Sequence, residues 1–404
     1  MKTRNNGLLV VSVALVMFSI TQSTFAGGLF INEFGTPSMG TAGAGAQGWA
    51  DDASTSFHNP AGLTRLEGAE FMTTGGVAYS RVIFDVEATP ISGGSGGDAG
   101  GWAPLGGLFY GQRLNDDFAF GFNMFSISGA VLDYDNDWAG RFFVQDTQLL
   151  TLTFNPSLAY KMTDNLSVAA GLGAIYGALE LDIGLPGGVL PGPGTATLDG
   201  DDWEFGYSFS LMYELSEQTR LGALYWSEAE FEFSGDFEAR PVGVSVGTDT
   251  DLPLPQWVKG GVYHQLNNKW ALLGTVGWED WSTMDELLIS TESGSTSVAR
   301  NWYDTYHYAG GVHYRPAEKW LLQAGIAYDT SPVDARDRTP DMPIDRQVRY
   351  ATGVQYQKSK TFKVGAALEY VDLGDAAISR PLLRGDYDDN EVYFLGVYAN
   401  WKFQ

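Results

Sequence analysis

The chain has 404 residues, of which 24 are Lys or Arg and 49 are Asp or Glu, giving a formal net charge of −25. This acidic balance excludes nucleic acid as the expected partner, because binding phosphates requires a basic surface. The sequence has no cysteine, which excludes disulfides and thiolate metal sites. Only 18% of the residues are charged and 14% are aromatic, the reverse of a disordered acidic chain, so the chain is expected to fold.

The N-terminus has the pattern of a secretory signal peptide. Lys2 and Arg4 precede an apolar run over 8–20, and small residues follow at 24–26. The apolar run is shorter than the roughly 20 residues that a membrane-spanning helix needs. We therefore expect residues 1–26 to be removed on export.

Apolar and polar residues alternate along most of the chain from residue 148 onward, which is the period of a β-strand. The clearest segment is 203–215, where aromatic and aliphatic residues occupy the odd positions. About fourteen such segments occur, each near the roughly 9–11 residues of a tilted membrane-spanning strand. The predicted strands are 69–80, 102–113, 118–130, 148–161, 165–180, 203–215, 220–233, 256–266, 270–281, 306–315, 320–329, 347–357, 361–372 and 391–403.

Short polar turns alternate with long loops between these strands. Short turns at one end and long loops at the other are typical of an even-stranded barrel of the Gram-negative outer membrane. In such a barrel the short turns and both termini lie on the periplasmic side. Outward positions are aliphatic in mid-strand and Trp or Tyr near the ends, and inward positions are mostly polar or Gly. The predicted long loops are 81–101, 131–147, 181–202, 234–255, 282–305, 330–346 and 373–390.

Residues 27–66 precede the first strand and do not alternate. They are too rich in Gly and Ala to form a core alone and too apolar for a solvated tail. A barrel of about fourteen strands has a lumen wide enough to need filling. We therefore predict an N-terminal plug, or hatch, inside the lumen, with Asp51 or Asp52 capping a short helix and Pro60 fixing the turn after Asn59. The fold class is all-β, a transmembrane antiparallel β-barrel over 67–404.

The hatch segment resembles the FadL/TodX family of outer-membrane transporters for long-chain fatty acids and aromatic hydrocarbons. The similar segments are NEF (Asn32, Glu33, Phe34), ADDAST at 50–55 and NPAG (Asn59, Pro60, Ala61, Gly62). WAGRFF at 138–143, FNPSLAY at 154–160 and YVDLGDA at 370–376 are also similar to family segments. The resemblance thus covers nearly the whole mature chain.

This resemblance implies a 14-stranded barrel whose hatch rearranges to release a captured hydrophobic ligand sideways through a gap at a kinked third strand. The segment 118–130 stands in the place of that strand, and Asn123, Ser126 and Gly129 suit a bulge or kink. The loops at 181–202 and 234–255 are shorter than expected for a capture groove. Partners implied are the ligand, outer-membrane lipid and lipopolysaccharide, with the protein a monomer.

Two sets of side chains are candidates for contacting the ligand. Arg349 and Lys363, with Arg315 and Arg384, could pair with a fatty-acid carboxylate, or could instead pair with acidic groups of the lumen such as Glu204, Glu214, Glu228, Glu230 and Glu279. Leu224 and Trp226 are apolar although they occupy inward positions, which are otherwise mostly polar or Gly. Together with Leu29 they predict an apolar ligand path.

Other motifs carry less information. GAGAQG at 43–48 matches a nucleotide-binding spacing, but no strand precedes it. GGSGG at 93–97 and GVSVG at 243–247 match a nucleophile-elbow spacing but lie in predicted loops. The four histidines lack a spacing that one metal ion could bridge, and DYDD at 386–389 is interpreted as a hydrated acidic loop. No metal, cofactor or catalytic residue is predicted.

The sequence therefore predicts a passive outer-membrane transporter for hydrophobic molecules, most simply long-chain fatty acids. Aromatic or alkane hydrocarbons are the alternative ligands, since pockets for chains and rings use the same residue types. A porin for polar solutes is disfavoured by the plug. A lipase is disfavoured because the sequence shows no recognisable Ser/His/Asp set.

Overall fold

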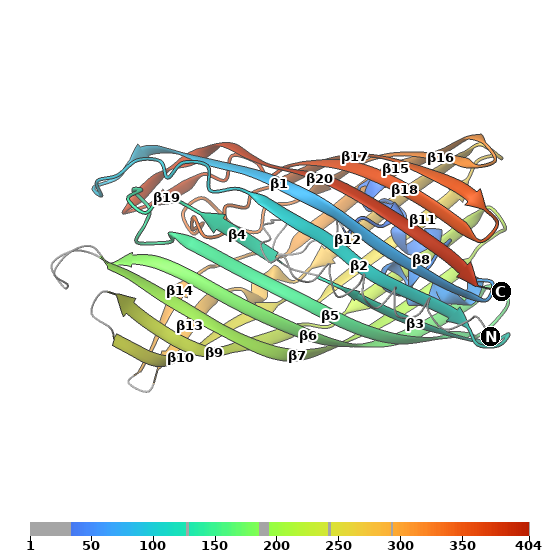
Figure 1. The fold of residues 1–404 in the computed structure, drawn as a ribbon, viewed down its shortest axis with the longest axis horizontal. Coiled ribbons are helices and arrows are strands. Elements are labelled where there is room, and N and C mark those ends of the chain that lie inside the picture. The colour runs from blue at the N-terminus through green and yellow to red at the C-terminus, as the bar shows by residue number, and fades with distance from the viewer. Residues whose placement is uncertain (1–33, 127–128, 186–193, 241–243, 292–293, 404) are drawn as a thin grey trace, which may run out of the picture.

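The computed structural model describes residues 34–126, 129–185, 194–240, 244–291 and 294–403. Within these ranges the strands join one antiparallel sheet, and β1 pairs with both β2 and β20, which closes the sheet into a barrel (Figure 1). The strands are β1 (Ala69–Ala88), β2 (Trp102–Arg113), β3 (Phe118–Phe125), β4 (Gly129–Asp133), β5 (Asp146–Lys161), β6 (Leu166–Leu185), β7 (Gly194–Glu214), β8 (Thr219–Trp226), β9 (Ala229–Arg240), β10 (Val244–Leu254), β11 (Trp257–Gln265), β12 (Trp270–Glu279), β13 (Glu286–Thr291), β14 (Gly294–Ala299), β15 (Thr305–Ala317), β16 (Trp320–Asp329), β17 (Gln347–Ser359), β18 (Phe362–Asp372), β19 (Ile378–Arg380) and β20 (Leu383–Phe403).

The barrel has fourteen strands, as predicted, because several of the shorter strands continue their neighbours around the same wall. For example, β4 continues β3 and β9 continues β8. Both predicted loop classes appear: short turns gather at the end where the C-terminus lies, and longer connections at the other end (Figure 1). No helix in the described ranges is long and apolar enough to cross a membrane.

Several strands run well past the predicted membrane-spanning length, so parts of six of the seven predicted loops are strand instead. β6 and β7 pair as far as Leu185 and Gly194, and β9 and β10 pair as a hairpin over much of 234–255, including Val244 to Gly247 of the GVSVG motif. The acidic run at 386–389 lies within β20 and is not a loop. Hydropathy marks where a strand leaves the membrane, whereas backbone hydrogen bonding continues beyond it.

Side chains on the two faces of the wall differ as expected at most positions. Outward positions such as Phe205, 74% exposed, and Leu172, 69% exposed, form the lipid-facing surface, while Leu224 and Trp226 point inward and are buried. The prediction of a polar or glycine lumen is wrong for the long-loop half, whose inward face is aromatic and aliphatic. This inner face includes Phe231, Phe233 and Trp257.

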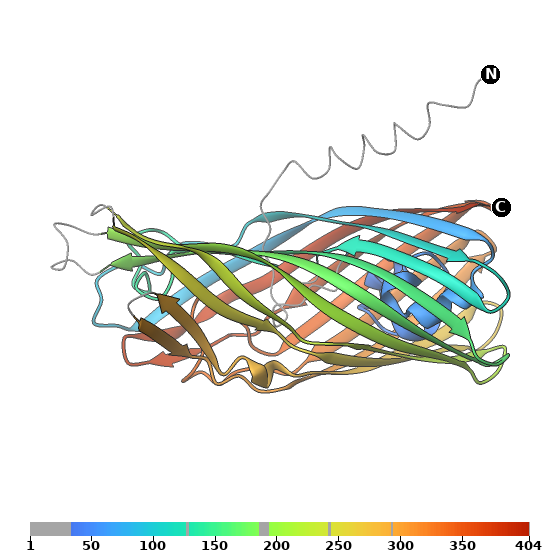
Figure 2. The same cartoon turned by 90° about the horizontal axis from the view of Figure 1, so that it is seen from below.

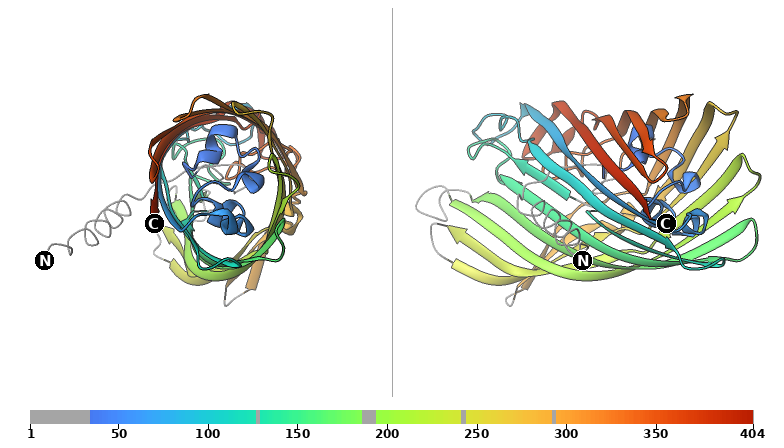
Figure 3. Two further views of the ribbon diagram at one scale, coloured as in Figure 1. Left: turned by 90° about the vertical axis from the view of Figure 1, so that its right-hand side faces the viewer. Right: turned by 45° about the vertical axis from the view of Figure 1, so that its right-hand side comes forward.

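The described part of the hatch, 34–66, folds into four short helical turns inside the barrel at the short-turn end (Figures 2 and 3). They are η1 (Pro37–Thr41), α2 (Ala46–Trp49), α3 (Thr55–His58) and η2 (Pro60–Arg65). Neither Asp51 nor Asp52 occupies the N-cap of a helix; Ser54 does so for α3, and the Asp52 carboxylate accepts hydrogen bonds from the Ser54 amide and hydroxyl. Asn32, Glu33, Leu29 and residues 1–26 lie outside the described residues.

Glycines on the inner wall let the hatch backbone lie directly against the strands. A Cβ added at Gly325 of β16 would clash with the Thr41 carbonyl, and one at Gly222 of β8 would clash with the Gln47 carbonyl. In contrast, a Cβ at Gly310 of β15 would meet no atom within 4 Å. The hatch therefore fits this lumen only because specific wall positions lack a side chain.

We expect Gly325→Ala to displace the hatch without unfolding the barrel, because the new methyl group overlaps hatch backbone rather than a flexible side chain. The ionic conductance of the protein in planar bilayers should rise relative to the wild type. Gly310→Ala, at an open position on the neighbouring strand, is the matched control and should leave the conductance unchanged. Equal conductance of both variants and the wild type would contradict this role of the wall glycines.

Candidate functional site

The third strand of the barrel, made of β3 and β4, is broken by a bulge. Phe125 of β3 pairs with Thr153 of β5, and Gly129 of β4 pairs with Leu150. The register of the third strand against β5 therefore shifts by one residue between Phe125 and Gly129, as it does at a β-bulge. Ser126 is the first residue of this break and Gly129 the first after it, so the structure places both at the predicted kink.

The break interrupts the barrel wall. β2 pairs with β3 only from Gly107 to Arg113, and its pairing with β1 continues to Trp102. Within the described residues, β4 pairs with β5 alone. Among the residues that the structure describes, the edge of β2 from Trp102 to Gly106 thus has no strand partner on the side of the third strand.

The hatch contacts the third strand directly beside this interruption. The Asn123 side-chain amide donates a hydrogen bond of 2.7 Å to the Ser56 carbonyl of α3. The rings of Phe34 and Phe57 from the hatch lie 4.8 and 4.3 Å, centroid to centroid, from the ring of Phe125. Asn123 therefore tethers the hatch to the kinked strand, a contact that the sequence did not predict.

The NPAG turn holds the hatch to itself and to β7. The Asn59 side-chain amide donates to the Gln47 carbonyl at 2.7 Å and to the Leu211 carbonyl of β7 at 2.9 Å. Pro60 begins η2, and the Ala61 amide donates to the Ser210 hydroxyl at 3.0 Å. A Cβ at Gly62 would lie 2.6 Å from that of Ala50, so this turn packs too closely for a larger residue.

Lys363 joins the hatch to the opposite wall through a buried ion pair. Its ammonium lies 2.9 Å from the Asp52 carboxylate and 3.2 Å from the Asp51 carbonyl, and its side chain is 2% exposed. Arg349 lies 3.1 Å from Asp329 and donates to the Gln347 amide oxygen at 2.7 Å. Both predicted carboxylate ligands thus contact acidic groups of the chain itself, although not the glutamates named from sequence.

The remaining two candidate cations are placed differently. Arg315 is partly buried in β15, near the hatch end of the lumen. Burial raises the pKa of Asp51, but nearby positive charges, first Lys363 and then Arg315, lower it, and the net pKa is below the usual value. Arg384 is exposed in the outer part of β20, paired in the ladder with Ala88 and Ser379. The structure does not bring the four cations into one site.

A belt of paired ionisable side chains crosses the inner wall on neighbouring strands. Lys259 of β11 lies 3.1 Å from Glu279 of β12, and His307 of β15 lies 2.7 Å from Asp329 of β16, which also contacts Arg349 of β17. These side chains are nearly all buried. Aligning the predicted strands side by side would have revealed the belt, because His307 and Asp329 are opposite each other in the ladder and the other two pairs are diagonal neighbours.

Apolar side chains line the lumen beyond the belt as one connected cluster. It runs from hatch residues Phe34 and Phe57 and the kink residue Phe125 to Trp281, Trp302 and other residues under the outer loops. Leu224 and Trp226, predicted from their inward position, belong to it and are 1% and 3% exposed. An apolar inner wall of this extent is suited to the passage of an apolar molecule.

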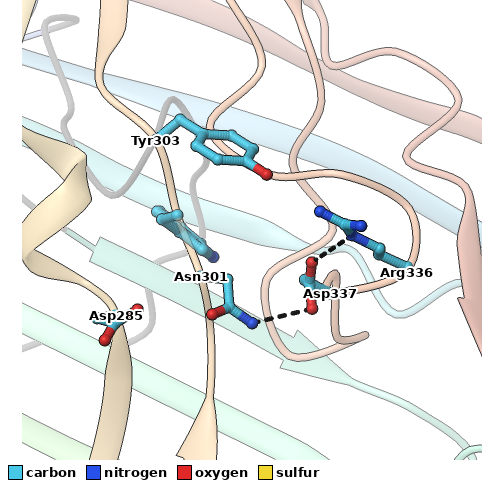
Figure 4. A pocket seen from close by; sticks show the side chains of 6 residues that line it. Asp285, Asn301, Tyr303, Arg336 and Asp337 are labelled. Carbon is cyan, nitrogen blue, oxygen red and sulfur yellow. Dashed lines mark hydrogen bonds and ion pairs between the residues drawn. The ribbon is translucent and has the colours of Figure 1, made fainter.

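An open cavity of about 500 Å³ lies between the loop segments around Trp302 and Asp337 (Figure 4). Asp337 accepts hydrogen bonds from the Asn301 amide and the Arg336 guanidinium, each 3.0 Å long. Trp302 reaches from this cavity into the apolar cluster. In the part of the chain that the structure describes, no group of His, Asp and Glu residues is arranged to hold a metal ion.

The fold and the site define an outer-membrane transport barrel, closed around a hatch and interrupted at one strand. The family model for "Outer membrane protein transport protein (OMPP1/FadL/TodX)" matches residues 17–403. The chain belongs to this family, whose members are outer-membrane transporters of hydrophobic compounds, and it resides in the outer membrane.

Curated relatives agree over most of the length. A "Long-chain fatty acid transport protein" of Escherichia coli O6:H1 is 26% identical, with 90% of each chain covered. The "Outer membrane protein P1" of Haemophilus influenzae is 25% identical, covering 92% of this chain and 90% of its own.

Solved structures show the same fold. A Pseudomonas aeruginosa FadL homologue superimposes with a TM-score of 0.87 at 21% identity, covering 94% of this chain and all (100%) of its own. The Pseudomonas putida toluene transporter TodX superimposes with a TM-score of 0.69 at 19% identity, covering 91% of this chain and 97% of its own.

We expect Lys363→Met to loosen the hatch, because it leaves Asp52 buried without its cation, a loss of about 3–5 kcal/mol for a buried pair. Hydrogen exchange of hatch amides 46–58 should accelerate strongly, while barrel amides stay protected. Lys360→Met, at an exposed turn on the same end, is the control. Unchanged exchange in Lys363→Met would show that the ion pair does not anchor the hatch.

The hatch should also loosen in acid through His58. Its ring nitrogen Nε2 lies 2.9 Å from the Ser38 hydroxyl, and burial lowers the pKa of His58 from 6.5 to about 4. The docked hatch favours the neutral ring, so its stability is complete above pH 6.5 and declines as the pH falls towards 4. Hatch amide exchange, corrected for intrinsic rates, should rise between pH 7.5 and 5, and His58→Gln should flatten that dependence.

Proposed function

We propose that the protein takes up long-chain fatty acids across the outer membrane by passive diffusion through the hatch-gated barrel, with sideways exit into the bilayer. The carrying observation is the apolar cluster that connects the outer loops with the wall interruption at Phe125. The curated relatives named as long-chain fatty acid transport proteins, matched nearly end to end, support the same ligand class.

The route follows from which surfaces are apolar. A ligand leaving water at the outer loops gains about 25 cal/mol for each Å² of apolar surface that it buries against the lumen. The hatch fills the periplasmic end, so the path inside the barrel ends beside the third strand. There the missing β2 partner leaves a side exit towards the hydrocarbon interior, which is the favourable destination for a long alkyl chain.

Aromatic hydrocarbons are the second candidate ligands, because solved structures that share the fold include toluene transporters. An open porin for polar solutes fits less well, since hatch side chains such as Met39, Trp49 and Phe57 are buried against the inner wall. We propose further that the working unit is one chain embedded in lipid and lipopolysaccharide, and that transport involves no catalytic step.

Deletion of Ser126 tests the side exit. It leaves two residues opposite the two of β5, which restores an even ladder and allows the third strand to pair with β2 along the interruption. Uptake of radiolabelled oleate by cells expressing the variant should fall to the level of cells lacking the protein, while the folded barrel still shows heat-modifiable mobility on gels.

Ser126→Gly is the matched control, because it changes the same residue and preserves the residue count that makes the bulge. It should transport oleate like the wild type. Full uptake by the deletion variant would rule out exit through this interruption, and no uptake by the wild-type protein would overturn the proposed function itself.

A further inference from the structure

Uncharged polar side chains form a row on the inner wall beside the kink and the hatch. They lie on three strands and on α3, and each is at most 4% exposed. At least one polar side-chain atom of each makes no hydrogen bond to any residue within the described ranges, and Asn155 lacks partners for both its amide nitrogen and its oxygen. The members are Ser56, Asn123, Thr153, Asn155, Ser157 and Ser208, and we call them the polar row.

The polar row is continuous across the sheet. Asn123 pairs with Asn155 in the ladder between β3 and β5, and Gly171 of β6 is opposite both Ser157 and Ser208. A Cβ at Gly171 would lie 2.6 Å from the Ser208 hydroxyl and 2.9 Å from the Asn155 amide oxygen. These groups therefore converge on a wall position that carries no side chain of its own.

The row reaches the hatch and the ligand path at its two ends. A Cβ at Gly121 would lie 2.5 Å from the Ser157 hydroxyl and 3.2 Å from the Cβ of Ser56, which places α3 against the row. At the other end, Ser208 pairs with Trp226, whose buried indole nitrogen also lacks a partner among the described residues. Phe57, Phe125 and Trp226 of the apolar cluster flank it.

Such a row is costly for the fold alone. Leaving a buried donor or acceptor without a partner destabilises the folded state, and here several such groups adjoin one another. A stable barrel could place alanine or valine at these positions. Both donors and acceptors are present, which suits a small group that itself donates and accepts hydrogen bonds.

The buried cations of the structure do not offer a partner for a charged head group. In the described ranges, five of them contact carboxylates at 2.6–3.4 Å: Lys259, Arg300, Arg338, Arg349 and Lys363. The sixth, Arg220, donates to the Gly48 and Trp49 carbonyls of the hatch. In addition, the outer hairpin over 229–254 carries six acidic residues against one arginine, which opposes the approach of anions.

We infer that the polar row is the binding subsite for the uncharged, hydrogen-bonding head group of a long-chain ligand, such as the hydroxyl of a fatty alcohol. The alkyl chain lies in the apolar cluster, and the head group rests beside the side exit. This inference rests on the proposed function and deepens it, because a fatty acid is then held as its undissociated form. A carboxylate would be desolvated there without a free cation to compensate it.

The test compares three ligands of equal chain length: radiolabelled 1-hexadecanol, palmitate and hexadecane. Equilibrium binding to the full chain in nanodiscs at pH 7.4 is measured, with empty nanodiscs subtracted. Wild-type protein should bind hexadecanol about tenfold more tightly than hexadecane, since two net hydrogen bonds contribute about that factor. Hexadecanol should also bind more tightly than palmitate.

Asn155→Leu combined with Ser208→Ala should remove the preference for hexadecanol over hexadecane and leave hexadecane binding unchanged. Asn268→Leu, in an exposed periplasmic turn, is the control and should keep the preference. Because the double variant could perturb the wall, Ser208→Ala alone is measured as well and should lower the preference partly.

The outcomes separate the inference from the proposed function. Tighter binding of palmitate than of hexadecanol by the wild type overturns the inference while supporting fatty-acid uptake. A preference for hexadecanol that survives in both variants, or equal loss of all three ligands, also overturns it. Failure of the wild type to bind any of the three contradicts the proposed function as well.

Discussion

A membrane-spanning strand must satisfy every backbone hydrogen-bonding group within the sheet, because the hydrocarbon offers no partner. This constraint determines the closed architecture. β1 and β20, at opposite ends of the described chain, pair from Ala69–Phe403 outward along nearly the whole of both strands, which closes the sheet into a barrel. Alternation of side chains then divides each strand between lipid and lumen, so an acidic chain with a mean hydropathy of −0.12 still presents an apolar outer face.

Pairing in the described sheet is incomplete beside the third strand, as it also is along β14 and β19, which pair with β13 and β20 alone. Between β2 and the third strand the ladder stops at Gly107, and the hatch covers the inner side through Asn123 and the rings around Phe125. Inside the barrel, buried charged side chains such as Lys259, Arg349 and Lys363 contact carboxylates of the chain itself. Pairing of this kind offsets the cost of removing these charges from water.

Strand periodicity made most of this architecture predictable from the sequence. All fourteen predicted segments correspond to strands. The inward positions of Leu224 and Trp226 followed from the alternation along their strand, and both side chains are buried. The polar strand extensions, such as the outer part of β7, were not predictable from hydropathy because Asp, Thr and Gly there alternate outside the membrane.

Contacts across the lumen also could not be predicted from the sequence. Periodicity places Lys363 on the inner face but does not indicate that it meets Asp52, a residue 311 positions away. The same holds for Asn123 and Ser56, which are 67 positions apart. A face is a local property of one strand, whereas a partner depends on barrel closure, strand tilt and the position of the hatch.

The relative strength of the hatch contacts favours the sideways route over passage through the periplasmic end. Leaving sideways disturbs the packing of Phe34 and Phe57 on Phe125, where an aromatic pair contributes about 0.5–1.5 kcal/mol beyond its buried area. It also disturbs the single hydrogen bond from Asn123 to the hatch, which contributes about 0.5–1.5 kcal/mol. Leaving through the end would break the Lys363–Asp52 pair and the Asn59 hydrogen bonds, and a buried pair alone costs about 3–5 kcal/mol when it is broken. The hatch is thus weakest where it faces the interrupted wall, and a ligand in the apolar cluster meets that side first.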